Sequence, residues 1–235
     1  MPVLSSSSVL DLWDRGSQLH SLDQGLLALS VGFPETSCQT LADWPLGRRN
    51  RALAELRWSW FGPQLEGWAA CPQCAEKLEF QLDARSFAAL EAPGPEPVVV
   101  NGRSFRLPTS RDLARAAGET DPQSAALRLL EACRLSLEDG EGGALSLDDL
   151  EAVGEKLAAA DPLAETRLSL VCPNCGNQWD DTVDIAAFLW ADIDARARRL
   201  LHEVHTLGSA YGWTEREILS LSDRRRAVYL GMAQA

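Results

Sequence analysis

Four of the six cysteines in this chain occur in two short motifs, Cys71–Cys74 (CPQC) and Cys172–Cys175 (CPNC). A Cys-x-x-Cys turn directs two thiolates to one side of a tight loop, and two such turns can complete a tetrahedral site for Zn²⁺. The proline after each first cysteine presets the turn, and Gly176 allows a positive φ after the second motif. We call the motifs the first and second knuckles, and we predict that Cys71, Cys74, Cys172 and Cys175 hold one structural zinc ion.

Each knuckle lies in the same local pattern. An apolar run precedes it (Leu65–Ala70 and Leu168–Val171), and a strand-like run follows it (Lys77–Leu82 and Gln178–Ile185). This repetition indicates one ribbon arm that occurs twice. We therefore predict a split zinc ribbon formed by residues 65–84 and 166–183, with a long insertion between the two arms.

Other interpretations of the cysteines remain open. A thioredoxin-like redox pair would require its Cys-x-x-Cys at a strand-to-helix junction, whereas each knuckle here joins two strand-like runs. Disulfides would require an exported chain, and nothing in the sequence suggests export. Of the two isolated cysteines, Cys133 lies in a helical apolar run and is expected in the core, and Cys38 lies in a polar turn with no visible partner.

Charge and hydropathy exclude several functional classes. The chain carries 22 Lys and Arg residues against 34 Asp and Glu residues, a net charge of −12. Because phosphate neutralisation supplies most nucleic-acid affinity, we expect no general nucleic acid binding. The sequence has neither the basic and apolar regions of a signal peptide nor an apolar run of ~18 residues. We therefore expect no membrane insertion and a cytoplasmic location.

The 8 tryptophans are more than a chain of this size needs for its core, and tryptophan is favoured at contact surfaces. For four of them the simpler interpretation is a core position beside the zinc. These are Trp58, Trp60, Trp68 and Trp190.

Residues 1–64 are predicted to form an N-terminal helical segment. Its helices are expected over Val9–Arg15, Leu19–Val31 and Gly47–Phe61, with a turn at Leu41–Leu46. The third helix carries four arginines, which form either a docking patch for an acidic partner or a solvated face. These are Arg48, Arg49, Arg51 and Arg57.

Residues 85–165 are predicted to form an inserted β-hairpin and helices. Asn101-Gly102, between two apolar runs, is typical of a type I′ turn. Capping boxes at Thr109/Asp112 and Ser146/Asp149 open two of the helices, and a third is expected over Gln123–Leu135. The glycine-rich acidic segment Asp139–Gly143 is expected to be a loop.

Residues 184–235 are predicted to form a C-terminal helical region. The longest helix is expected over Asp184–Leu207, where apolar residues recur at helical spacing. After the Tyr211–Trp213 turn, a capping box at Thr214 opens a short helix, and Ser222 opens the last one, which carries Arg224–Arg226. The predicted fold class is therefore α+β and mostly α-helical.

No motif indicates catalysis. The sequence lacks a phosphate-binding loop, a nucleophile elbow and an ordered Ser/His/Asp set. His202 and His205 have metal-compatible spacing, but no HExxH pattern surrounds them, and a role on the surface or between helices is expected. A metalloenzyme would need activity that depends on these histidines. Since a tetrathiolate zinc has no open coordination position, we do not expect an enzyme.

Three stretches resemble a known family. They are 202–230 (HEVHTLGSAYGWTEREILSLSDRRRAVYL), 107–113 (LPTSRDL) and the two CPxC knuckles. Together they resemble phage-type baseplate proteins related to the T4 baseplate hub assembly protein, which occur in tailed phages and contractile injection systems. The resemblance implies a non-catalytic assembly factor, chaperone or structural component that binds other baseplate or tail proteins, in the cytoplasm or in an assembled particle.

We predict that partner contacts involve Tyr211, Trp213, Arg224, Arg225 and Arg226. For Trp213 the alternative is a hydrophobic staple against its own capped helix. The alternative function is a zinc-ribbon regulatory or nucleic-acid-associated factor, which would show salt-dependent binding to DNA or RNA.

Overall fold

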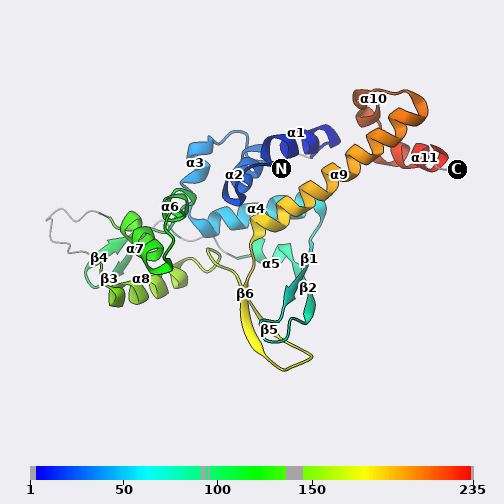
Figure 1. Cartoon of the computed structure of the whole chain (residues 1–235). Coiled ribbons are helices and arrows are strands. Elements are labelled where there is room, and N and C mark those ends of the chain that lie inside the picture. Colours follow the sequence, from blue (N-terminus) through cyan, green and yellow to red (C-terminus); the bar gives the residue numbers. More distant parts are fainter. Residues whose placement is uncertain (1–3, 91–93, 95, 136–144, 234–235) are drawn as a thin grey trace.

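A computed structural model describes residues 4–90, 94, 96–135 and 145–233, and it confirms the mostly helical α+β class (Figure 1). The helices in this part of the chain are α1 (Ser6–Gly16), α2 (Ser21–Gly32), α3 (Cys38–Ala42), α4 (Leu46–Phe61), α5 (Ala84–Ala88), α6 (Ser110–Ala116), α7 (Pro122–Cys133), α8 (Leu147–Ala160), α9 (Ile185–Tyr211), α10 (Glu215–Ser220) and α11 (Asp223–Ala233). The strands pair as antiparallel hairpins, β1 (Gln64–Ala70) with β2 (Lys77–Asp83), β3 (Val98–Val100) with β4 (Arg103–Phe105), and β5 (Arg167–Val171) with β6 (Gln178–Thr182).

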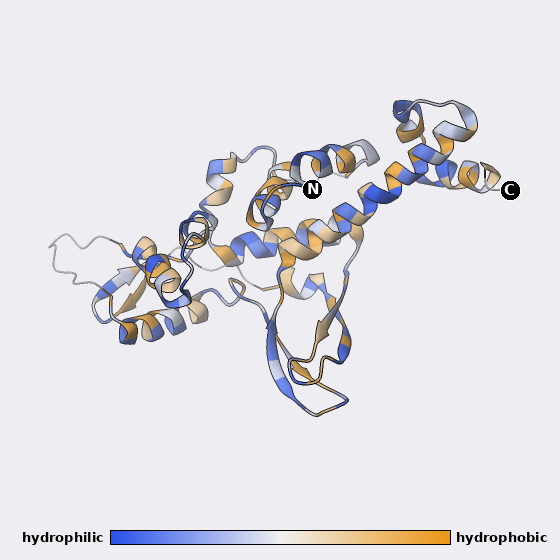
Figure 2. Ribbon diagram, viewed as in Figure 1, coloured by the Kyte–Doolittle hydropathy of each residue, from blue (hydrophilic) through white to orange (hydrophobic). Residues whose placement is uncertain are grey.

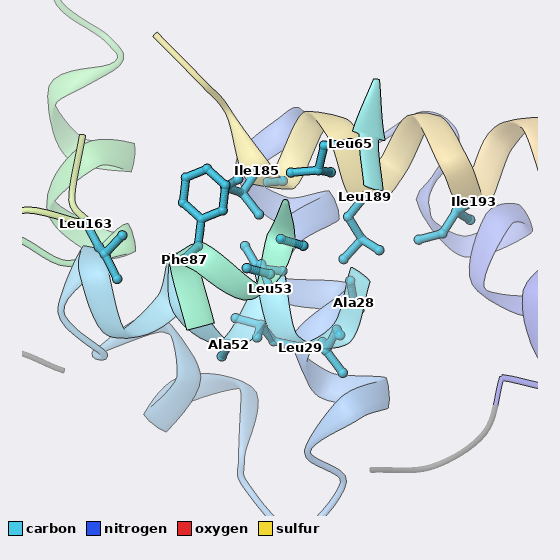
Figure 3. Packing of buried hydrophobic residues seen from close by; sticks show 14 of the residues in the cluster. Ala28, Leu29, Ala52, Leu53, Leu65, Phe87, Leu163, Ile185, Leu189 and Ile193 are labelled. Atoms are coloured by element: carbon cyan, nitrogen blue, oxygen red, sulfur yellow. The ribbon is translucent and has the colours of Figure 1, made fainter. Parts of the chain in front are cut away.

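The helical body consists of α1, α2, α4 and the first half of α9, which pack on one another. Figure 3 shows Ile185, Leu189 and Ile193 of α9 in the same cluster as Leu29 of α2 and Leu53 of α4. These residues are almost completely buried, and each buried leucine or isoleucine stabilises the fold by about 1.5–3 kcal/mol. The apolar stripe of α9 therefore anchors the C-terminal half of the chain to the N-terminal helices.

Helix α9 has clear local start and stop signals. The Asp184 carboxylate accepts hydrogen bonds from the backbone N–H groups of Ala186 (2.9 Å) and Ala187 (3.1 Å). Gly212, with φ 70°, ends the helix one turn later than predicted. The stretch of α9 that leaves the body is strongly hydrophilic in Figure 2. Among the described helices, even this one of 27 residues lacks the continuous apolar length that a bilayer crossing requires.

The end of α9 packs against α10 and α11, and we call residues 201–233 the C-terminal arm. In Figure 1 the arm lies beyond the body, on the side away from β3, β4 and α8. The two knuckle hairpins, β1–β2 and β5–β6, project from the body side by side. Three separate parts of the chain thus extend from one helical body.

The inserted unit, residues 98–160, has a core of its own. Phe105, Leu130, Val153 and Leu157 are among its buried members. The predicted hairpin is confirmed, with positive φ at both residues of its Asn101-Gly102 turn. The predicted loop over residues 139–143 lies outside the described residues.

The inserted unit is held to the body by a helix cap supplied across the chain. Pro45 precedes α4 and offers no side-chain cap, and the buried Asp161 carboxylate instead accepts a hydrogen bond from the Gly47 N–H at 2.8 Å. Asn50 donates to the backbone oxygen of Leu163 at 2.8 Å. Residues 161–163 therefore fasten the end of the insertion to α4.

Two of the tryptophan predictions are wrong. Trp58 is 45% exposed and Trp68 is 63% exposed, so neither fills the core. Trp68 lies on the outer face of β1, where the ammonium of Lys77 lies 4.9 Å from its ring centroid. Trp60 and Trp190 are half-buried and pack against the main core without being buried in it, so for them the prediction is confirmed only in part. Alternation along β1 places Trp68 on the face opposite Leu65, which is completely buried.

Neither interpretation of the α4 arginines holds for all four. Arg49 and Arg57 are each 7% exposed, so they are neither a docking patch nor a solvated face. Arg57 donates from Nε to Asp192 Oδ2 at 2.9 Å and from Nη1 to the Gly62 oxygen. Of the other two, Arg48 is exposed and lies over the Trp44 ring, and the half-buried Arg51 pairs with Glu55.

Candidate metal centre

The two knuckles bring four sulfur atoms together. The Sγ atoms of Cys71 and Cys175 are 3.7 Å apart, those of Cys74 and Cys172 are 3.5 Å apart, and all four lie within 4.8 Å of one another. A disulfide would need an S–S distance of about 2.0 Å. A tetrahedral site with Zn–S bonds of about 2.3 Å has S–S edges of about 3.8 Å. The predicted ligands therefore lie together in an arrangement that fits a tetrathiolate metal site.

The backbone holds both knuckles in the same conformation. In the first, Cys71 donates to the Glu76 oxygen at 2.8 Å and its own oxygen accepts from the Ala75 N–H at 2.9 Å. In the second, the equivalent bonds join Cys172 to Asn177 and Gly176, at 2.8 and 2.9 Å. Each turn closes with a left-handed residue, Ala75 at φ 60° and Gly176 at φ 73°, and the latter confirms the prediction for Gly176.

The alanine in this left-handed position leads to a prediction. A residue other than glycine destabilises the folded state by roughly 1–2 kcal/mol in this region. Glycine avoids that strain, but it costs about 0.5–1 kcal/mol in chain entropy on folding, so the net gain is smaller. We expect Ala75→Gly to stabilise the first knuckle by about 0.5–1 kcal/mol, measured by urea unfolding. The matched control is Gly176→Ala. Its added Cβ meets nothing within 4 Å, so the only cost is the backbone strain of an alanine at positive φ. It should destabilise the second knuckle by a similar amount, and a gain in stability would contradict the argument.

Side-chain amides from the second knuckle reach the sulfurs of the first. Asn174 Nδ2 lies 3.7 Å from Cys74 Sγ, and Asn177 Nδ2 lies 3.9 Å from Cys71 Sγ. Amide donors close to a metal-bound thiolate disperse its negative charge and orient it. The amides of the second knuckle therefore help to orient the sulfur atoms of the first.

The thiols of the cluster differ in how readily they ionise. Burial disfavours the Cys71 thiolate, but hydrogen bonds from the backbone of Cys74 and Gln73 and from neighbouring thiols lower its pKa to about 6. At Cys175 a backbone hydrogen bond from Asn177 favours the thiolate, yet burial and the three other sulfurs raise the pKa to about 12. A first thiolate therefore forms easily and the last one does not, because the negative charges repel one another. A divalent cation at the centre removes that repulsion.

The donor set fits Zn²⁺. Four thiolates in tetrahedral reach are characteristic of structural zinc sites, and such sites leave no coordination position for a substrate. Cys71 and Cys172 are buried at 3% and 2% exposure, whereas Cys74 and Cys175 lie on the outer side of the cluster. Within the described residues this is the one group of three or more potential metal ligands.

The reactivity of the six cysteine thiols tests how many of them bind the metal. Cys38 is exposed at the start of α3 rather than in the predicted turn, and Cys133 is completely buried, as predicted. Burial raises the pKa of Cys133 to about 12, with Asp112 adding to the rise and Arg106 opposing it. We expect the zinc-loaded protein to react at Cys38 alone with a thiol reagent, the four knuckle thiols to react after a chelator is added, and Cys133 only after denaturation.

Cys38→Ser is the control for this labelling experiment. It should abolish the reaction of the native protein and leave the chelator-dependent step unchanged. Rapid modification of any knuckle thiol in the loaded protein would contradict the closed site.

The predicted contact residues lie on the C-terminal arm, where the structure adds a third aromatic residue. Tyr211 stacks on Trp213 with ring centroids 4.7 Å apart, and Tyr229 of α11 meets Trp213 edge-on at 4.9 Å. Tyr211 is 38% exposed and Trp213 is half-buried. Tyr229 was not among the predicted contact residues, although its spacing of three from Arg226 places both on neighbouring turns of the last helix.

Arg226 is a correction to the predicted contact set. Arg224 and Arg225 are exposed, but Arg226 is 1% exposed. Its Nε donates to Glu203 at 2.8 Å and one Nη donates to Asp223 at 2.5 Å. Arg226 cannot contact a partner protein, because its guanidinium is buried and bonds α11 to α9. The run of three arginines hides this difference because helical geometry turns only one of them inward.

His202 and His205 are exposed on α9 and do not join any group of three or more potential ligands in the described residues. Comparison of the chain with protein-family models, with curated proteins and with solved structures finds no match.

Proposed function

We propose that this protein is a non-catalytic assembly or structural component of the baseplate of a phage tail or phage-like contractile injection system. It acts through protein–protein contacts, and a structural zinc ion stabilises it. The baseplate assignment rests on the motif resemblance described above, and the closed donor set of the four cysteines supports a structural rather than a catalytic metal.

The observation that carries the proposal is the exposed surface of the C-terminal arm. Tyr211, Val228 and Met232 are 38%, 51% and 63% exposed, on the same arm as the exposed Arg224 and Arg225. Aromatic, methionine and arginine side chains are enriched at protein interfaces. The arm also contains the whole segment 202–230 that resembles the baseplate family.

The zinc centre has a supporting role in this proposal. The knuckle hairpins have no other strand neighbours in the described residues, so the metal is needed to fix their mutual orientation. With the hairpins fixed, the body presents the inserted unit and the C-terminal arm as separate surfaces. Such a shape suits a protein that joins several neighbours.

Affinity capture tests the proposal. The tagged full-length chain is captured, after brief cross-linking, from cells that carry its gene cluster and produce the particle. We expect tail or baseplate proteins to be enriched with the wild type and to be lost with Arg224→Glu combined with Val228→Asp. Lys156→Glu, a charge reversal on the exposed side of α8, is the control and should retain them.

Recovery of no tail or baseplate component by the wild type would overturn the proposal. Salt-dependent binding of the purified protein to DNA or RNA would favour the regulatory alternative instead.

A further inference from the structure

A cavity of ≈ 570 Å³ lies at the junction of the body, the inserted unit and the base of the β5–β6 hairpin. Its volume is within the range of small-molecule sites, about 300–1,000 Å³. The start of α2, Arg49 of α4, and residues of α6 and α7 contribute to its lining. It is separate from the zinc centre and from the C-terminal arm.

Arg49 is the unusual residue of this cavity. It is 7% exposed, and its Nε is buried without a hydrogen-bond partner among the described residues. Burial lowers the pKa of Arg49, and electrostatic attraction to the Asp184 carboxylate opposes that shift. The equally buried Arg57 shows the normal arrangement, since it is paired with Asp192. A buried N–H group without a hydrogen-bond partner costs about 1–3 kcal/mol, so its retention calls for a reason.

The acidic side chains of the cavity are already engaged. Asp184 caps α9 through Ala186 and Ala187, Glu119 pairs with Arg128, and Glu165 pairs with Arg167 at 3.0 Å. His20 uses its Nδ1 to accept from the Leu22 N–H at 3.3 Å. Arg49 is therefore the cation that a ligand would neutralise.

The wall that α6 and α7 form is apolar. Leu113 and Ala116 of α6 and Ala125, Ala126 and Leu129 of α7 contribute to it. The alanines leave room beside the leucines, and such a surface favours a hydrocarbon group. The cavity thus combines one unpaired cation with an apolar face.

We propose that this cavity binds a small amphipathic carboxylate, with the carboxylate on Arg49 and the hydrocarbon part against α6 and α7. A guanidinium can bind a carboxylate through two parallel hydrogen bonds. A single negative charge is favoured over phosphate because the carboxylates of Glu119, Glu165 and Asp184 line the same cavity. This site is independent of the proposed baseplate role.

Titration calorimetry of the zinc-loaded full-length chain with octanoate tests the proposal. We expect saturable binding by the wild type and at least a tenfold weaker binding by Arg49→Met, since a charge-assisted pair is lost. Ala126→Leu, which fills the apolar wall and keeps Arg49, should also weaken binding. Arg48→Met, on the adjacent exposed arginine outside the cavity, is the matched control and should bind as the wild type does.

The stability of the free protein provides a second readout. Arg49→Met removes an unpaired buried charge, so the unliganded variant should be at least as stable as the wild type in urea. A destabilised Arg49→Met variant that still binds octanoate would show a purely structural role and overturn the proposal. Three other results would also overturn the proposal. They are equal binding of octylamine, competition by inorganic phosphate as strong as by octanoate, and no octanoate binding at millimolar concentration.

Discussion

Replacing Cys172 by serine is expected to unfold the β5–β6 hairpin, to loosen the knuckle end of the β1–β2 hairpin and to abolish zinc binding. Binding of structural zinc supplies on the order of 10 kcal/mol in small zinc domains, and most of that would be lost. The β5–β6 hairpin has little else to hold it, whereas the base of β1 stays anchored in the main core by Leu65. The β5 and β6 strands contain no completely buried residue, and a lone two-stranded hairpin is marginal in water. The body should survive, because its core is formed largely by helices.

Zinc content by elemental analysis and amide hydrogen exchange over residues 64–83 and 167–182 check this expectation. A chelator should reproduce the exchange pattern in the wild type. Cys38→Ser is the matched control, since the exposed Cys38 is not part of the cluster, and it should keep one zinc per chain and wild-type protection. Full zinc occupancy and protected hairpins in the Cys172→Ser variant would contradict the four-thiolate site.

Replacing Arg226 by methionine is expected to cost about 3–5 kcal/mol, because breaking a buried ion pair leaves its partner unpaired. Arg226 joins three parts of the chain. It pairs with Glu203 of α9, it donates to the Leu221 oxygen at 2.7 Å, and it reaches Ser6 Oγ of α1 at 3.1 Å. Loss of these bonds should release α11 from α9, measured by hydrogen exchange in residues 223–233 and by urea unfolding.

Arg225→Met is the control for this prediction, since the side chain of Arg225 is exposed one residue away. It should change stability by no more than about 0.5 kcal/mol. Arg226→Lys should not restore the wild type, because an ammonium cannot reproduce the several directed bonds of the guanidinium. If Arg226→Met unfolds at the same urea concentration as the wild type, the buried pair does not hold the arm.

Acid should weaken the same contact. Burial raises the pKa of Asp223, but Arg196 and Arg226 outweigh it and lower the pKa in the folded protein. The stabilisation from Asp223 is therefore present above its unfolded pKa and is lost as the pH falls through its folded pKa. This acid dependence should be smaller in Arg226→Met.

Local patterns were sufficient to predict the four-cysteine cluster and the long helix. The repeated flanks of the knuckles implied matching hairpins, and the structure brings Cys74 to within 3.5 Å of Cys172. The apolar stripe of α9 predicted its buried face through Ile185, Leu189 and Ile193. Both features depend on short-range periodicity, which a single sequence contains in full.

Features that depend on packing between distant segments were not predictable in the same way. Arg49 and Arg57 flank Leu53 at helical spacing, so they lie on the buried stripe of α4, but their burial depends on α2 and α9 covering that stripe. Trp68 was assigned to the core from its residue type, whereas strand alternation from the buried Leu65 places it outward. Asp161 caps α4 from a position 114 residues away, and no local signal marks it.

The order in which the chain is made gives the split ribbon a further consequence. Cys74 and Cys172 are separated by 98 positions, and ribosomes add about 5–20 residues per second. The first pair of thiols must therefore wait roughly 5–20 s before the second pair is translated. During that interval the nascent polypeptide has only half of its coordination sphere, exposed to oxidation and to competing metals. The zinc site can therefore be completed only after the ribosome has translated the whole insertion.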